Sequence, residues 1–135
     1  MNHNEASFTD IKITGPNDEL TNVPEPSRPA MYDVYFRLSD SPPDEWVQAF
    51  MQAWQLRMYS MKRRAWIESD HLIIHCALAE IEKYHKRELL AVISQVNQEY
   101  KKLISQQALR ATQAAERQAV EDQKKKNILG GLKFD

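Results

Sequence analysis

The chain has 135 residues, a net charge of −1, 42% hydrophobic residues and 27% charged residues. This length fits one domain with appendages, and the near-neutral charge argues against nucleic-acid binding by bulk electrostatics. The amino terminus lacks a basic start followed by an apolar run, and no stretch of about 18 apolar residues occurs. The single cysteine, Cys76, has no partner for an internal disulfide. We therefore expect a cytoplasmic protein in a reducing compartment that does not contact a membrane.

Residues 1–30 form a polar leader with closely spaced prolines. Because proline disfavours helix and central strand, residues 17–30 are predicted to be an extended linker. Residues 8–14 alternate partly through Ile11 and Ile13. They are either a strand added at the edge of a sheet or a disordered arm.

The clearest strand is residues 31–38, whose side chains alternate between two faces. The face predicted to be buried carries Tyr32, Val34, Phe36 and Leu38. The other face carries Asp33, Tyr35 and Arg37. A second alternating pattern, residues 64–76, predicts a β-hairpin with a polar turn at residues 68–71. Its inward set is Ala65, Ile67, Leu72, Ile74 and Cys76, and its outward set is Arg64, Trp66, Glu68, His71, Ile73 and His75.

Two helices are predicted beside these strands. Proline and acidic residues at 40–45 favour a helix start, and this helix is expected to reach about residue 59. Its apolar stripe is predicted to be core and consists of Trp46 or Val47, Phe50, Trp54 and Met58. The second helix begins near residue 78 and has a stripe over about seven turns. That stripe consists of Leu78, Ile81, His85, Leu89, Val92, Val96, Tyr100 and Leu103.

Helical composition continues through residues 105–126, but this extension has few large apolar residues to bury. Its charge also differs, because residues 101–126 carry seven basic and three acidic groups. Glycines are predicted to end the helix and leave an apolar terminal peptide, residues 127–135. The peptide is either a disordered tail or a docking segment that uses Ile128, Leu129, Leu132 and Phe134.

The order β-α-β-β-α over residues 31–104 predicts an α+β domain with a three-stranded sheet, or a four-stranded one if residues 8–14 add an edge strand. A right-handed crossover makes the first two strands of this core parallel, with the third between them or outside. With the third strand between them, the pattern resembles half of a ferredoxin-like layout. The strand at residues 31–38 would then have an unpaired edge, so we expect the leader, a second copy or a partner to cover it.

The uncovered sheet face is the main candidate binding surface. Its candidate partner-binding residues are Tyr35, Arg37, Arg64, Trp66, Ile73 and His75. Aromatic rings interleaved with arginines are typical of RRM-like platforms that bind single-stranded nucleic acid. However, neither RNP consensus is present, and Asp33 and Glu68 would repel phosphate on the same face. The apolar Ile73 at the centre favours a protein partner.

No cofactor, metal or small-molecule substrate is expected. His71 and His75 would lie roughly 13 Å apart along a strand, too far to share one ion. His85 is interpreted as a hydrogen-bonded core or rim residue, Cys76 as a small buried hydrophobe, and the acids at 80, 82 and 88 as a solvated helix face. No catalytic motif or glycine-rich phosphate loop occurs. The sequence therefore predicts a non-enzymatic protein interaction module, an accessory or adaptor subunit with a protein partner or a second copy of itself, with nucleic-acid binding as the alternative.

Overall fold

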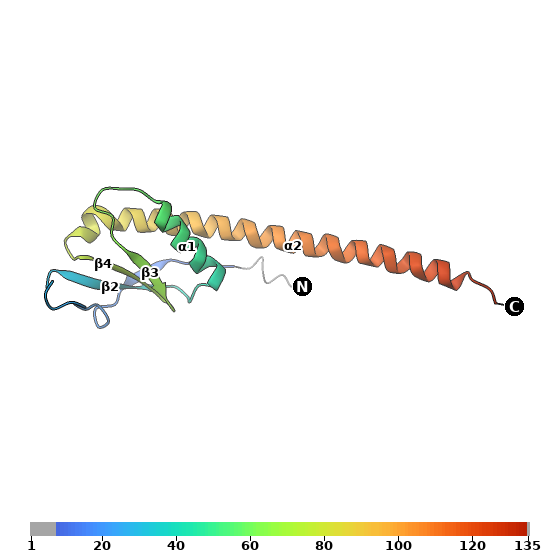
Figure 1. Ribbon diagram of the computed structural model, residues 1–135, viewed down its shortest axis with the longest axis horizontal. Helices are drawn as coiled ribbons and strands as arrows, with labels where there is room; N and C mark the ends of the chain where they lie inside the picture. The colour runs from blue at the N-terminus through green and yellow to red at the C-terminus, as the bar shows by residue number, and fades with distance from the viewer. Residues whose placement is uncertain (1–7, 135) are drawn as a thin grey trace. The chain divides into compact units, whose positions relative to one another are not determined.

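The computed structural model describes residues 8–134, which fall into two units, residues 9–100 and residues 101–134 with residue 8. The first unit holds a four-stranded antiparallel open sheet and two helices (Figure 1). The elements, in chain order, are β1 (Ile13–Pro16), β2 (Met31–Leu38), α1 (Asp44–Leu56), β3 (Ala65–Glu68), β4 (His71–Ala77), the π-helix η2 (Ile81–His85) and α2 (Lys86–Gly130). The α+β class predicted from the sequence is confirmed.

The strand order in the sheet is β1-β2-β4-β3. Strand β4 lies between β2 and β3 and is antiparallel to both, so β2 and β3 run in the same direction. The hairpin β3–β4 turns at Ser69, which adopts a left-handed φ of 54°. The resemblance of the wider layout to half of a ferredoxin-like fold stays a prediction.

The leader itself covers the outer edge of β2. Strand β1 pairs with β2 at Ile13–Pro16, a few residues later than the segment 8–14 proposed from the sequence. Backbone pairing continues past it, because Asn17 N–H donates to the Tyr35 carbonyl at 2.8 Å and Asn22 pairs with Asp33. The segment 17–22, expected to be linker, therefore bonds β2 through Asn17 and Asn22 at its two ends, with a turn at residues 18–20 between them.

Helix α1 packs three aromatic rings into the core. Trp46, Phe50 and Trp54 are buried, and their rings stack at centroid distances of 5.9 and 6.2 Å. The prediction that Met58 continues this stripe is wrong. The helix ends at Leu56, because the chain becomes extended at Arg57, and Met58 is left exposed.

The two faces of the sheet differ less in side-chain burial than the alternating pattern predicted. Val34, Leu72, Ile74 and Cys76 are buried as expected, whereas Phe36 is only half-buried. On the opposite face, Ile73 is fully buried although the pattern placed it on an open surface. The register explains this, since Ile73 lies directly between two aromatic residues of its neighbours, Tyr35 on β2 and Trp66 on β3. Ile73 therefore offers no surface to a partner.

A buried asparagine on α2 fastens the leader to the core. The Asn97 Oδ1 atom accepts from the Ile11 N–H at 3.0 Å and from the Trp46 indole N–H at 2.9 Å. Its Nδ2 donates to the Ile11 carbonyl at 2.9 Å. One side chain thus satisfies polar groups from the leader and from α1, which would otherwise be buried without partners.

Replacing this asparagine should destabilise the first unit. Asn97→Ala leaves two donors and one acceptor buried and unsatisfied, so the free energy of unfolding should fall by about 2–4 kcal/mol. Chemical denaturation followed by tryptophan fluorescence measures the change. Gln95→Ala is the matched control on the same helix, because Gln95 is exposed and bonds only Glu99 among the contacts described for it. Equal stability of the two variants would contradict this role for Asn97.

Helix α2 continues to Gly130, beyond the predicted boundary at residue 126, so Ile128 and Leu129 lie in its last turn. In the second unit, every residue from 109 to 134 is exposed. Among the described residues, no helix is long and apolar enough to cross a membrane.

Candidate functional site

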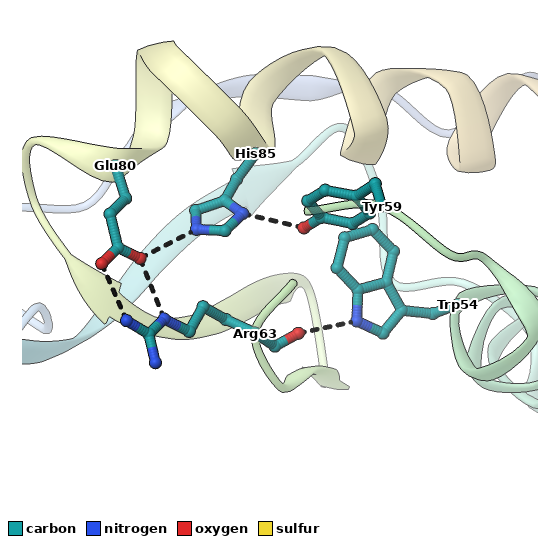
Figure 2. A network of polar contacts seen from close by, with 5 residues as sticks. All are labelled: Trp54, Tyr59, Arg63, Glu80 and His85. Carbon is teal, nitrogen blue, oxygen red and sulfur yellow. Dashed lines mark hydrogen bonds and ion pairs between the residues drawn. The ribbon is translucent and has the colours of Figure 1, made fainter. Parts of the chain in front are cut away.

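The most organised group of polar side chains is a partly buried network below the start of α2 (Figure 2). Arg63 binds Glu80 in a bidentate ion pair, with nitrogen to oxygen distances of 3.0 and 2.9 Å. His85 Nε2 lies 3.1 Å from the same carboxylate, and its Nδ1 lies 2.8 Å from the Tyr59 hydroxyl. The Arg63 carbonyl accepts the indole N–H of Trp54 at 3.0 Å, which ties the network to the aromatic core of α1.

Two short segments between regular elements place these groups. Arg63 and Tyr59 lie in the connection from α1 to β3. Glu80 precedes the π-helix that follows β4, and His85 is the last residue of that helix. A π-turn contains one more residue per hydrogen-bonded ring than an α-turn, and such turns are frequent at functional sites. Here Glu80 and His85 bond each other across five residues.

The charges within the network are well defined. Hydrogen bonding to the Arg63 guanidinium lowers the pKa of Glu80 to about 2, so Glu80 is ionised at neutral pH. Burial, reinforced by the Glu88 carboxylate, raises the pKa of Tyr59 to about 12. The Tyr59 hydroxyl therefore keeps its proton at neutral pH, and the ionised Glu80 carboxylate can only accept the hydrogen bond that it shares with Nε2 of His85.

Cys76, the last buried residue of β4, lies beside this network. Its sulfur, a Glu80 oxygen and a His85 nitrogen all lie within 4.8 Å of one another. Burial raises the pKa of the Cys76 thiol to about 12, so the group is not a thiolate nucleophile at neutral pH. The expectation that Cys76 is a buried small residue is confirmed.

Most of this network was not predicted from the sequence. Glu80 and Glu88 were assigned to a solvated helix face, but both side chains are largely buried and bind Arg63 and Arg57. The prediction for His85, a hydrogen-bonded core residue, is confirmed. Helical spacing alone does not show that an arginine in a loop seventeen residues earlier meets Glu80. Only the tertiary fold brings them together.

The sheet-face candidates lie on neighbouring strands, but most of them already have partners within the fold. The Arg64 guanidinium stacks on Trp66 at 4.4 Å, and the Trp66 indole donates to Glu68 at 2.7 Å. The remaining polar members also have partners within the fold. Arg37 donates to the Pro16 carbonyl, His75 bonds Asp33, and Tyr35 packs against His71.

The four candidates near the carboxyl terminus lie in the other unit. Ile128, Leu129, Leu132 and Phe134 are all exposed, and Phe134 retains 91% of its accessible surface. The helical turn ends where Gly131 N–H bonds the Asn127 carbonyl at 3.2 Å. Ile128 and Leu129 lie in the last turn of α2, and Leu132 and Phe134 follow it.

Comparisons with protein-family models, with curated proteins and with solved structures found no match to this chain.

Removing the Glu80 charge should make the free energy of unfolding less dependent on pH in the acid range. Because its pKa is lowered in the fold from 4.5 to about 2, the ion pair stabilises the protein above the unfolded pKa, and this stabilisation is lost as the pH falls through about 2. Glu80→Gln should lower the free energy of unfolding by about 1–3 kcal/mol at neutral pH. Denaturant titrations at several pH values should show this difference closing in acid. Glu82→Gln is the control, since that side chain is 80% exposed, and a constant gap across the pH range would refute the assignment.

Proposed function

We propose that this chain is a non-enzymatic protein interaction module, an accessory or adaptor subunit, whose main contact is the helical arm of residues 105–134. The observation that supports it is the exposure of every residue from 109 to 134 although the arm contains large apolar side chains. These are Leu109, Val120, Ile128, Leu129, Leu132 and Phe134.

The arm gains little stability from its own side chains. Helices draw most of their stability from packing an apolar face. The (i, i+4) side-chain pairs of the arm, such as Gln118–Asp122, are exposed and contribute only a few tenths of a kcal/mol each. Burying one leucine or isoleucine against a partner contributes about 1.5–3 kcal/mol. The apolar residues near the end of α2 therefore form the best anchor for a partner.

The charge of the arm indicates the chemistry of that partner. Residues 101–126 carry seven basic and three acidic groups, and residues 124–126 are three consecutive lysines just before Ile128 and Leu129. Charge complementarity favours a protein groove that is apolar at its base and acidic at its rim. A second copy of the chain is the other partner considered, and the oligomeric state distinguishes the two.

The sheet has a smaller part in this proposal than the sequence indicated. Its β2 edge is covered by the leader, and Ile73 is buried. Two strand edges are left for a partner among the described residues, the outer edges of β1 and β3, and each of these strands is only four residues long. The polar rim of the sheet face would consist of Tyr35, Arg37, Arg64, Trp66 and His75.

Substituting the apolar end of the arm tests the proposal. The double variant Ile128→Ser/Leu129→Ser removes the anchor, so the chain should shift from a larger assembly to its monomer mass in size-exclusion chromatography of extracts from the cells that produce it. Light scattering on the purified chain identifies self-association. Gln113→Ser/Gln118→Ser is the matched control, because both positions are exposed and polar. A wild-type chain that elutes as a free monomer from those extracts would contradict the proposal.

The alternative function, binding of single-stranded nucleic acid by Tyr35 and Trp66, has weaker support. One face of the Trp66 ring already carries the Arg64 guanidinium, and the Glu68 carboxylate accepts the indole N–H. A base would have to displace the arginine and approach a carboxylate.

Single-stranded RNA and DNA should therefore leave the tryptophan fluorescence of the full chain unchanged at low salt. The comparison with Trp66→Phe isolates the contribution of this ring from those of Trp46 and Trp54. Quenching that disappears in Trp66→Phe and weakens at high salt would favour the nucleic-acid function instead.

A further inference from the structure

The group Cys76, Glu80 and His85 has the composition of a metal site. A thiol sulfur, a carboxylate oxygen and an imidazole nitrogen come within 4.8 Å of one another between the end of β4 and η2. Cys76 and His85 are fully buried, and the Glu80 side chain is 13% exposed. Sulfur, nitrogen and oxygen ligands are the set that Zn²⁺ accepts in proteins.

Cys76 is the member of this group that the fold does not otherwise use. Glu80 binds Arg63 and His85, and His85 also binds Tyr59, but the contacts described for the Cys76 side chain include no hydrogen bond. Its sulfur is buried and lies within 4.8 Å of a Glu80 oxygen and a His85 nitrogen. A buried polar group without a partner beside two further ligand types is the second feature that indicates a ligand here.

We propose that Cys76, Glu80 and His85 bind a zinc-type divalent cation, with a water molecule in the fourth position. Tetrahedral bonds of about 2.0–2.3 Å place neighbouring ligand atoms roughly 3.3–3.8 Å apart. Since the three ligand atoms lie within 4.8 Å of one another, they need to move closer by about 1.5 Å at most. Side-chain rotations of Glu80, the residue that precedes the π-helix, supply this movement more readily than the strand that carries Cys76.

Binding changes the bonds of the network in a defined way. The Cys76 S–H bond breaks, its proton leaves to solvent, and a metal to sulfur bond forms. His85 binds the metal through Nε2, so its ring proton moves to Nδ1 and is donated to the Tyr59 oxygen. A hydrogen bond of this kind to the second ring nitrogen is usual for metal-ligating histidines.

Arg63 is the competitor for the same carboxylate. Its guanidinium binds both Glu80 oxygens, and its positive charge opposes a cation. The Arg63 side chain is 34% exposed, so it has a path into solvent when the metal arrives. Arg63→Gln should therefore tighten metal binding, whereas Tyr59→Phe should weaken it by about 10–100-fold through loss of the outer hydrogen bond.

The test uses the full chain after removal of metals with a chelator. Stoichiometric Co²⁺ should give thiolate-to-cobalt charge-transfer absorption, and Zn²⁺ should abolish it and raise the melting temperature. Mg²⁺, which prefers oxygen ligands, should do neither. The cobalt spectrum of the wild-type chain needs no variant, so it decides the matter even if a substitution in the core fails to fold.

Two variants then assign the ligands. Cys76→Ala should abolish the charge-transfer band and weaken Zn²⁺ binding at least about 10-fold, while His71→Gln, on the sheet face, should leave both unchanged. Absence of the band in the wild type, or Zn²⁺ affinity unaffected by Cys76→Ala, would overturn the proposal.

Discussion

The Glu80 carboxylate joins the connection between α1 and β3 to the π-helix that precedes α2. It receives Arg63 from the connection before β3 and His85 from the π-helix, and through His85 it reaches Tyr59 in the loop after α1. A buried carboxylate is costly unless it is paired and hydrogen-bonded, so all three segments must be in place for the charge to be tolerated. This requirement explains how a sheet of short strands holds the start of a long helix.

Asn97 makes an equivalent connection further along α2. It binds the backbone of the leader at Ile11 and the indole of Trp46, so α2, α1 and the amino-terminal segment share one buried amide. The leader then runs along β2 and covers its edge. Open edges pair readily with other chains, and this protein covers one of them with its own residues.

These features move the proposed partner contact from the sheet to the arm. The sheet face has satisfied most of its polar groups internally, and its central Ile73 is buried. The arm is the opposite case, since it combines exposed apolar residues near its end with an excess of positive charge. The proposed metal site is independent of the arm, because it lies entirely within residues 76–85.

Local patterns in the sequence determined the strand at residues 31–38, the hairpin, both helices and the aromatic core of α1, because period-two and helical repeats reflect which side chains are buried. The sequence also indicated a helical extension followed by an apolar segment. Burial of Ile73 was decided by strand register, which places it between Tyr35 and Trp66, and the end of α1 before Met58 was decided by the path toward the Arg57 and Tyr59 contacts. The Glu80 and Asn97 networks join residues distant in sequence, and no local pattern records such pairings. Only the tertiary structure brought these polar groups within hydrogen-bonding distance. The partner of each group lies on a distant segment, and local propensity does not determine where that segment lies.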